Sequence, residues 1–401
     1  MTNQITRHEW EKISYQELGL NQEQVQSFKK FLEDKELTTV LDFQLDGAQI
    51  GAHVGIIRFA NFQLNILPKI IGENDSICLE NLMFMLCYTR KLEIHSMDSA
   101  EISKTQQPFL EILIAHYANM LLNALQRHIP HHYETREDNL STVKGRILFA
   151  KNHLLNTANL ARVYCQFDEF SPNNLLNRTF KFVAHALRRL TISSTTRAFL
   201  DKILAIYDDV ELRPISYSQA KTILLNRNQL IFKDCLDLVL LFLQHCTISL
   251  HDKNFINLAI LFDMNKLFEE FVATGLENSF PRQVETQKPR AIIENIGGYP
   301  KTKYEIQPDI LFRNDTIIDT KYKIIDLPRK KPSSEDIYQM LAYHYFYKHP
   351  KIILCYPTYQ KNYNRVSVLE DKGCSITLLT LDLHQKLTEP YLQRIFYESF
   401  H

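Results

Sequence analysis

The chain has 401 residues and no net charge, because 46 Lys and Arg residues balance 46 Asp and Glu residues. None of its 10 glycines is followed by lysine and no two lie two positions apart, which excludes the P-loop and the GxGxxG dinucleotide motif. Seven cysteines without a CxxC pair argue against a zinc ribbon or a disulfide framework. The sequence shows no signal peptide and no membrane-spanning apolar run. We therefore expect a soluble, cytoplasmic protein with no membrane partner.

The first 160 residues predict an amino-terminal domain of mixed helices and strands. A helix is expected over residues 21–37, and two strands are expected over residues 53–59 and 62–70. Apolar residues at helical spacing predict two further helices over residues 78–88 and 109–125. The polar, charged segment 131–141 follows and is the first candidate boundary, so we place the end of this domain at residue 160.

Residues 161–256 predict a helical segment. Ser171 is expected to be the N-cap of a helix with Pro172 in its first position, because both residue types are favoured there. That helix is expected to end near Leu190, and further helices are expected over residues 196–208 and 234–248. The sequence therefore predicts an all-helical middle.

Residues 257–401 change character and alternate between helices and strands. The expected order is helix 263–276, strands 282–287, 304–313 and 316–325, a helix from Ser334 to Lys348, strands 351–356 and 375–381, and helix 391–400. Mixed alternation of this kind predicts an α/β layer domain. The whole chain is therefore expected to be α+β, with this α/β domain at its carboxyl end.

A candidate catalytic cluster lies in the carboxy-terminal domain, where Asp309 is followed by Asp319 and Lys321. Side chains alternate along a strand, so Asp319 and Lys321 share one face. Two carboxylates suit Mg²⁺, and an adjacent lysine can activate a water or offset negative charge. The same spacing also occurs in ordinary surface ion pairs. This instance differs because Asp319 follows two isoleucines in an apolar strand, where an unpaired charge is costly.

The two aspartates reach the same face only for one hairpin register. Asp309 must lie opposite Asp319, which requires a loop of odd length over residues 313–315 or a bulge. A two-residue turn would pair Asp309 with Thr320 and place the carboxylates on opposite faces. On the next helix, Gln339 and Tyr343 lie four residues apart and hence on one face.

These features resemble the PD-(D/E)XK nuclease superfamily, whose αβββαβ core and P-D…D-x-K motif they match, and Gln339 with Tyr343 is similar to the Q-x-x-x-Y helix of its RecB-like branch. More narrowly, the chain resembles the McrC family, the nuclease subunit of the McrBC modification-dependent (5-methylcytosine) restriction system. The matching stretches are residues 54–58, 66–70, 144–146, 168–178, 267–269 and 319–323.

The resemblance implies a role for each candidate site residue. Asp309 and Asp319 would bind Mg²⁺, and Lys321 would position or activate the attacking water. Glu269 would supply a further carboxylate, although helical geometry does not distinguish it from its neighbour Glu270. Gln339 and Tyr343 would orient the lysine or contact the DNA backbone, with helix packing as the alternative.

The resemblance also implies a partner, a ring-forming McrB-like AAA+ GTPase that recognises modified DNA. This chain would bind no nucleotide, would dock through residues 1–160 and would stimulate the GTPase. Candidate docking residues are Arg58, Lys69, Lys144 and Arg146, for each of which ordinary surface charge is the alternative.

DNA is the expected substrate of the carboxy-terminal domain. Residues 282–331 contain eleven basic and seven acidic side chains, so this region is locally positive. Arg329, Lys330 and Lys331 are candidate phosphate contacts, with a solvated loop as the alternative. No element that would read bases is visible.

The predicted function is therefore a Mg²⁺-dependent DNA endonuclease subunit of a GTP-dependent restriction complex. Two alternatives remain open. One is a standalone RecB-like repair nuclease, and the other is a non-catalytic assembly subunit that activates the GTPase.

Overall fold

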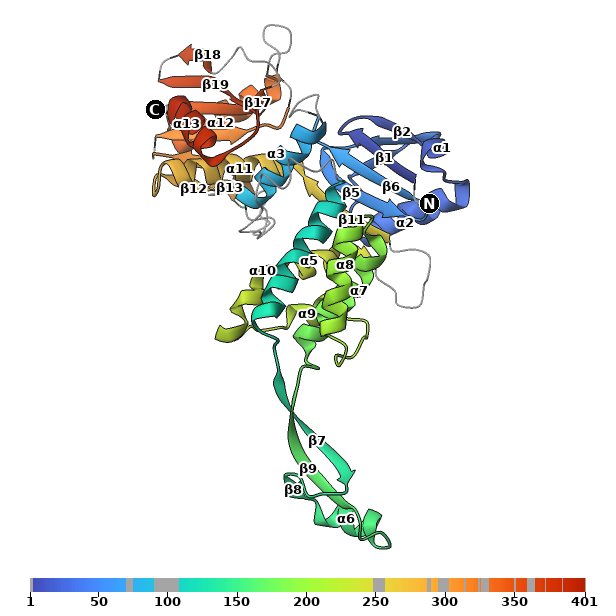
Figure 1. The fold of residues 1–401 in the computed structure, drawn as a ribbon. Coiled ribbons are helices and arrows are strands. Elements are labelled where there is room, and N and C mark those ends of the chain that lie inside the picture. The colour runs from blue at the N-terminus through green and yellow to red at the C-terminus, as the bar shows by residue number, and fades with distance from the viewer. Residues whose placement is uncertain are drawn as a thin grey trace. The chain divides into compact units, whose positions relative to one another are not determined.

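The computed structural model describes most of the chain and divides it into two compact units. The described residues are 3–69, 75–89, 108–247, 257–286, 290–294, 303–313, 315–323, 325, 332–349, 351–358, 365–371, 373–383 and 385–400. One unit comprises Met1–Phe109 and Leu258–His401, and the other comprises Leu110–Asn257. This division differs from the expected boundaries at residues 160 and 256, because the amino-terminal and carboxy-terminal regions fold together while the middle of the chain folds by itself (Figure 1).

The amino-terminal part of the first unit is built on two sheets. One contains β1 (Asn3–His8), β6 (Phe62–Leu67), β5 (His53–Phe59) and β11 (Asn257–Asp263), in that spatial order. The other places β4 (Gly47–Ile50) between β2 (Lys12–Ser14) and β3 (Leu41–Phe43). Helix α1 (Tyr15–Leu18) follows β2, and α2 (Gln22–Asp34) begins at an Asn21 capping box. Phe28 of α2 joins the two sheets in one apolar core.

Strand β11 comes from the carboxy-terminal half of the sequence but pairs antiparallel with β5. The two backbones approach closely at Gly55, whose φ is +132°. A Cβ atom there would lie 2.1 Å from the carbonyl oxygen of Ile260, so only glycine fits. This pairing explains why residues 1–160 do not form a separate unit.

The carboxy-terminal part has a six-stranded mixed sheet in the order β12-β15-β16-β17-β19-β18. These strands are Val284–Thr286, Ile310–Phe312, Thr316–Thr320, Lys351–Thr358, Cys374–Asp382 and Arg365–Asp371, respectively. β16, β17 and β19 are mutually parallel, whereas the other neighbours are antiparallel. Helix α12 (Ser334–Tyr347) contributes Met340 and Tyr343 to the apolar core on one face of this sheet.

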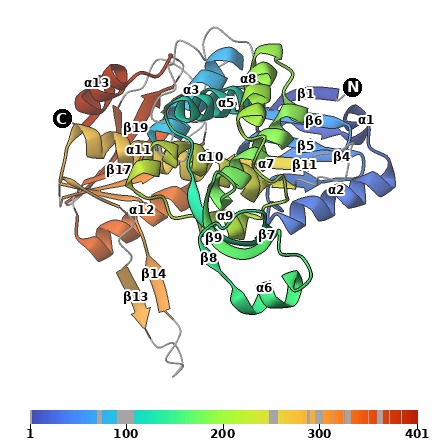
Figure 2. The same cartoon turned by 60° about the horizontal axis from the view of Figure 1, so that its bottom comes forward.

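The order α11 (Met264–Ser279), β12, β15, β16, α12, β17 confirms the predicted αβββαβ core. Three details differ. The predicted strand 304–313 is two strands, β14 (Lys303–Ile306) and β15, because the chain breaks at Gln307–Pro308–Asp309. Strands β13 (Arg290–Glu294) and β18 were not predicted, and β13 pairs with β14 as a separate hairpin (Figure 2). The N-cap of α12 is Ser333 rather than Ser334, since its hydroxyl accepts the Asp336 N–H.

Two further helices of the first unit lie among the residues that the structure describes. Helix α3 (Asp75–Tyr88) contacts α11, and α13 (Glu389–Phe400) packs against α11. In that second contact the Phe396 ring lies directly over Gly275. Asn81 of α3 donates to the carbonyl oxygens of Leu383 and Gln385 and accepts from the Leu387 N–H, which joins α3 to the segment before α13.

The second unit combines helices with a long hairpin. Its helices are α5 (Phe109–Arg127, which starts at the last residue of the first unit), α7 (Leu175–Leu190), α8 (Ser194–Ile206), α9 (Tyr217–Lys221), η1 (Arg227–Phe232) and α10 (Lys233–His245). α10 leads into β10 (Cys246–Thr247). Buried aromatic side chains, including Tyr117, Phe180 and Phe242, fill the helical core.

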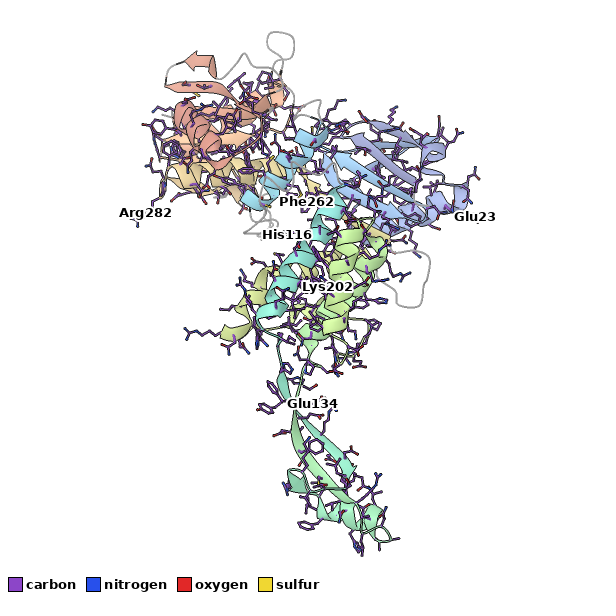
Figure 3. The ribbon with its side chains drawn as sticks, viewed as in Figure 1. Glu23, His116, Glu134, Lys202, Phe262 and Arg282 are labelled. Atoms are coloured by element: carbon purple, nitrogen blue, oxygen red, sulfur yellow. The ribbon has the colours of Figure 1, made fainter. Side chains whose placement is uncertain are left out.

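The hairpin projects from these helices, and we call it the arm (Figures 1 and 3). It comprises β7 (His132–Leu140), β8 (Arg146–Ile147), α6 (Phe149–Asn156) and β9 (Val163–Ser171). β7 pairs with β9 along nine residue pairs, from His132–Ser171 to Leu140–Val163. Glu134, labelled in Figure 3, lies on β7 of the arm.

The arm corrects three predictions. The polar segment 131–141 contains strand β7 and is not a domain boundary, because side chains of a small antiparallel sheet can stay in water. The segment 161–256 is not all-helical, since it begins with β9. Ser171 ends β9, and the N-cap of the next helix is Asn174, whose side chain accepts the Asn177 N–H.

In the described part of the chain, no helix is long and apolar enough to cross a membrane.

Candidate functional site

The β15–β16 hairpin has the register that the candidate site requires. Ile310 pairs with Ile318 and Phe312 pairs with Thr316, so three residues, 313–315, connect the two strands. Asp309 lies one residue before the first of these pairs and Asp319 one residue after its partner. Arg313 adopts a left-handed φ of +53° at the start of this loop. The prediction of an odd loop is confirmed.

Asp319 lies on the face of β16 that α12 covers. Ile317, two residues earlier on the same strand, packs with Met340 and Tyr343 of α12, and strand alternation places Asp319 on that same face. The Asp319 side chain is only 1 % exposed. Its carboxylate is therefore held in an apolar layer, where a charge needs a close partner.

Lys321 is the close partner of Asp319. Lys321 Nζ lies 2.7 Å from Asp319 Oδ2, and it donates to Gln339 Oε1 at 3.0 Å. Asp319 Oδ2 is a buried oxygen, and the Lys321 ammonium is its charge partner. The backbone N–H of Lys321 donates to the Cys355 carbonyl oxygen on β17, which fixes the chain where β16 ends.

Asp309 is held by the end of β16. Its Oδ2 accepts two hydrogen bonds from Thr320, one from the backbone N–H and one from the hydroxyl, both at 2.7 Å. Asp309 Oδ1 takes no part in these two hydrogen bonds. Thr320 was not predicted as a site residue. The only sequence signal for it is its position between the two ends of the D-x-K motif.

The pKa values of the cluster reflect burial first and mutual charge second. Burial raises the pKa of Asp319 to about 7; Asp309 adds to this rise, and Lys321 opposes it. Burial by itself lowers the pKa of Lys321, but the carboxylates of Asp319, Asp309 and Asp336 outweigh it and leave that pKa raised. Lys321 therefore keeps its proton at neutral pH. The three predicted residues form one electrostatic unit.

Helix α12 supports the cluster with a row of polar side chains. Gln339 Nε2 donates to the Tyr343 hydroxyl at 2.8 Å, and that hydroxyl donates to the Gln307 carbonyl oxygen at 2.9 Å. Lys321, Gln339 and Tyr343 are thus linked in series, with Gln339 and Tyr343 on one face of α12 as their spacing predicted. Tyr343 also packs in the core, which fits the helix-packing alternative, and its role in cleavage stays a prediction.

A second ion pair extends this row and was not predicted. Lys323 Nζ donates to both carboxylate oxygens of Asp336, at 3.1 and 3.3 Å. Asp336 is buried, and although burial acts to raise its pKa, its bonds with Lys323 and Ser333 lower the pKa overall. The sequence offered two signals for this ion pair. Lys323 follows Asp319 by an even number of positions, and Asp336 lies one helical turn before Gln339.

The remaining predicted residues lie in different places. Glu269 is half-buried on α11, next to Phe268, whose ring lies 5.9 Å from that of Tyr322. Its role as a further carboxylate stays a prediction, as does the choice between it and Glu270. Arg329, Lys330 and Lys331 lie outside the described residues.

The four docking candidates fall into two pairs. Arg58 is half-buried on β5 and Lys69 is exposed after β6, both in the first unit. Lys144 and Arg146 are exposed on the arm of the second unit. Gly145 between them has a φ of +67°, and a Cβ atom there would lie 2.4 Å from the Gln166 carbonyl oxygen. The turn that presents Lys144 and Arg146 therefore requires glycine.

The donor set was tested for Mg²⁺ on geometry and chemistry. The described residues contain no cluster of three or more His, Cys, Asp or Glu side chains able to hold a metal. Mg²⁺ does not need such a cluster, because it is usually bound by one or two carboxylates together with waters and substrate phosphates. The buried carboxylate of Asp319 and the neighbouring carboxylate of Asp309, which raises the pKa of Asp319, fit this pattern.

Comparison with known proteins gives family and fold. Over its whole length the chain is similar to a chain in a refined half-complex from a tetradecameric assembly of Thermococcus gammatolerans McrB AAA+ hexamers with bound McrC. The TM-score is 0.77 at 18% identity, covering 99% of both chains. A second similar structure is the Thermococcus gammatolerans McrBC complex, with a TM-score of 0.56 at 19% identity, covering 70% of this chain and 89% of that one. No curated protein matches.

The sequence itself matches a family described as McrBC 5-methylcytosine restriction system component over residues 48–357. This range includes Asp309, Asp319, Lys321 and the whole arm. The chain therefore belongs to the McrBC family of restriction-system components, as its resemblance to McrC predicted.

Proposed function

We propose that this chain is the metal-dependent DNA endonuclease subunit of a GTP-dependent restriction complex directed at modified DNA. The observation that carries the proposal is the cluster of Asp309, Asp319 and Lys321 at the end of β16. A buried carboxylate and a paired lysine at the end of a central strand, with a second carboxylate in register, match the PD-(D/E)XK arrangement. Family membership supports the restriction context.

Asp309 and Asp319 would hold the metal ion. Bound Mg²⁺ would polarise the scissile phosphate and lower the pKa of a water. Thr320 fixes one oxygen of Asp309, so this carboxylate would need little reorganisation when the ion binds. In this structure the positive charge beside the buried Oδ2 of Asp319 is that of Lys321. The bound ion would add a second positive charge there.

Lys321 would act as a cation rather than as a general base. Its raised pKa keeps the ammonium protonated at neutral pH, so it can orient a water and offset charge on the phosphate in the transition state. Gln339 accepts a hydrogen bond from Nζ and would keep it pointed at the reacting group. The sequence left two roles open for Lys321, positioning the attacking water or activating it, and this assignment keeps the positioning role.

The DNA contacts of the cluster would be to the sugar–phosphate backbone. Locally positive charge over residues 282–331 supports binding that does not depend on sequence. Arg329, Lys330 and Lys331 remain candidates for this role. Recognition of the modified base would belong to the partner.

The arm is the proposed docking element for a McrB-like AAA+ partner. Large apolar side chains are exposed along it; they are Tyr133, Val143, Phe149, Leu154, Leu155, Leu160 and Phe170. Several large apolar groups exposed on one element are typical of a protein interface. Lys144 and Arg146 lie among them, and a solved structure with the same fold contains McrB AAA+ hexamers with bound McrC.

The tip of the arm is held by polar contacts, which leaves its apolar groups for a partner. Asn139 and Asn156 exchange two amide hydrogen bonds at 2.9 and 2.8 Å. Asn152 accepts from Asn156 and from the Tyr164 N–H. Phe149 and Leu160 remain exposed although α6 packs on β9.

The proposal is tested by cleavage of 5-methylcytosine-containing DNA with the full chain, a McrB-like AAA+ partner, GTP and Mg²⁺. Asp319→Ala should lower cleavage by at least 10³-fold, as expected for loss of a metal ligand, while stimulation of the partner's GTPase is retained. Retained cleavage by Asp319→Ala would show that the catalytic assignment is wrong. A wild-type chain that stimulates GTP hydrolysis but never cuts would favour the non-catalytic assembly subunit, the alternative that the exposed arm supports.

A further inference from the structure

A buried hydrogen bond joins the start of the chain to the segment that carries Lys321. The Tyr322 hydroxyl donates to Glu9 Oε1 at 3.0 Å, across 313 positions of sequence. Tyr322 is 3 % exposed and Glu9 is fully buried. Both residues belong to the first unit, and neither takes part in the metal site or in the α12 row.

The backbone holds Glu9 firmly in place. The Glu9 N–H donates to the Leu67 carbonyl oxygen at the end of β6, and the Trp10 N–H donates to the Ile50 carbonyl oxygen at the end of β4, both at 3.1 Å. Trp10 has a left-handed φ of +61°, which is unfavourable for a bulky residue. The chain accepts this conformation at the point where it passes from one amino-terminal sheet to the other.

Tyr322 is held on its other sides by aromatic rings and by its own backbone. Its ring centroid lies 6.1 Å from that of Trp10 and 5.9 Å from that of Phe268 on α11. The flanking lysines are fixed to α12, Lys321 through Gln339 and Lys323 through Asp336. The segment 321–323 is therefore held by two sets of contacts. Its lysines bind α12, and its tyrosine contacts the residues between the amino-terminal sheets.

This arrangement bears on Lys321 because the two residues are adjacent in the chain. Displacement of Tyr322 would rotate the peptide that carries Lys321 and move Nζ away from Asp319 and Gln339. A carboxyl group as deeply buried as Glu9 is costly unless it is paired, and the Tyr322 hydroxyl and the Lys69 backbone supply hydrogen bonds to it. Buried polar pairs of this kind can specify a unique arrangement even when they add little stability.

We propose that Glu9 and Tyr322 are positioning residues for Lys321, so that the amino-terminal sheets set the geometry of the nuclease site. This inference rests on the proposed function of Lys321 in cleavage. The amino-terminal part of the chain would then belong to the catalytic apparatus as well as to partner docking.

Five variants of the full chain, one of them a control, test the proposal. Tyr322→Phe and Glu9→Ala each remove the hydrogen bond, while the Phe ring keeps the packing against Trp10 and Phe268. The double variant tests whether the two residues act through one contact. Glu9→Gln keeps an acceptor oxygen at the same position and is the conservative rescue. Tyr391→Phe is the matched control, because it removes the tyrosine hydroxyl that donates to the Asp382 carbonyl oxygen, elsewhere in the same unit.

Amide hydrogen exchange is the first measurement, since it needs no cleavage. Tyr322→Phe and Glu9→Ala should each speed exchange of peptides covering residues 319–323 by roughly tenfold, whereas Glu9→Gln and Tyr391→Phe should leave it unchanged. Unchanged exchange in both Tyr322→Phe and Glu9→Ala would overturn the proposal, whether or not the wild-type chain cuts DNA.

Cleavage kinetics with the AAA+ partner are the second measurement. The two single variants should lower kcat by about tenfold with KM for DNA unchanged, because misplacement of a reacting group affects the chemical step. The double variant should be no slower than either single variant. Multiplied losses in the double variant, or an equal loss in Tyr391→Phe, would contradict positioning through the Glu9–Tyr322 contact.

Discussion

Asp309 and Thr320 are joined by two hydrogen bonds to a single carboxylate oxygen, both 2.7 Å long. One donor is the backbone N–H, which no substitution other than proline removes, and the other is the threonine hydroxyl. The carboxylate is thus oriented by the strand that carries the second aspartate. This relationship makes the separation of the two proposed metal ligands a property of the hairpin.

Removal of the Thr320 hydroxyl should therefore weaken metal binding. Thr320→Val keeps the side-chain shape but leaves Asp309 with the backbone N–H alone. We expect Mg²⁺ affinity to fall about tenfold, the lower end of the effect of losing a group that orients a metal ligand. The measurement is the Mg²⁺ dependence of the cleavage rate, with calorimetric titration of the metal as a second readout.

Thr316→Val is the control for this variant. Thr316 lies at the other end of β16 and also donates its hydroxyl to a carboxylate, that of Asp315, at 2.8 Å. It should leave the Mg²⁺ dependence unchanged. Equal effects of the two substitutions would mean that Thr320 supports the strand rather than the metal site.

Gln339 should affect the chemical step rather than DNA binding. Gln339→Ala removes the acceptor that holds Lys321 Nζ at 3.0 Å and breaks the link to Tyr343. We expect the single-turnover cleavage rate to fall on the order of tenfold, because the ammonium is then less well directed, with the dissociation constant for DNA unchanged. Tyr338→Ala, on an exposed position of the same helix, is the control and should cut at the wild-type rate. A weaker DNA affinity at an unchanged rate would assign Gln339 to backbone contact instead.

The stability of the protein should depend on the protonation of Glu9. Burial raises its pKa from 4.5 to about 8, with a smaller rise from Asp263 and opposing contributions from Tyr322 and the Lys69 backbone. Between these values the folded state holds a proton that the unfolded state has released. The stabilisation is therefore complete below pH 4.5 and is lost as the pH rises toward 8, by up to about 1.4 kcal/mol per pH unit.

Thermal unfolding across this pH range checks the prediction. Glu9→Gln cannot release a proton, so its stability should fall less steeply with pH than that of the wild type. Tyr322 and Cys78, which also face Glu9, stay neutral because burial raises the pKa of both, that of Cys78 to about 12. Asp319 adds a slope of the same sign, since its pKa is raised to about 7, and the comparison with Glu9→Gln removes that contribution. Parallel pH profiles would show that Glu9 is ionised in the folded state.

The arm should be required for partner binding and dispensable for folding. We expect the double variant Phe149→Ser/Leu160→Ser to bind a McrB-like AAA+ ring at least tenfold more weakly, because a few apolar contacts usually dominate an interface. Both side chains are exposed, so the melting temperature should stay the same. Binding is measured by sedimentation or by biolayer interferometry with GTP present.

Leu224→Ser is the control for the arm variant. Leu224 is also highly exposed and lies in the same unit, between α9 and η1, away from the arm. It should bind the ring as the wild type does. If both variants bind normally, docking belongs to another surface, for which Arg58 and Lys69 are the remaining candidates.

Local sequence signals predicted most of the helices and the strands around the site. The helical pattern from Asn21 predicted α2, and the strands predicted over residues 304–313 and 316–325 contain β15 and β16. The arm was missed because β7 and β9 are polar on a ribbon with no sheet beneath them, so their alternation carries little apolar signal. The Ser171–Pro172 pair looked like a helix start, but backbone pairing extended β9 to Ser171 and moved the cap to Asn174.

The sequence by itself determined the chemistry of the candidate site: two aspartates and a lysine at strand spacing, a Q-x-x-x-Y helix after them, and no nucleotide loop in the chain. It left the register of the hairpin open, and showed only that an odd loop or a bulge is needed to bring both carboxylates to one face. The tertiary structure alone decided the register and the contacts around that cluster. Thr320 and Asp336 are placed by side-chain hydrogen bonds that periodicity does not report, and the Glu9–Tyr322 bond spans 313 positions of the chain. Local periodicity shows which face of a helix or strand is buried, but not which element packs against it. For that reason the pairing of β5 with β11, from distant parts of the chain, could not be predicted.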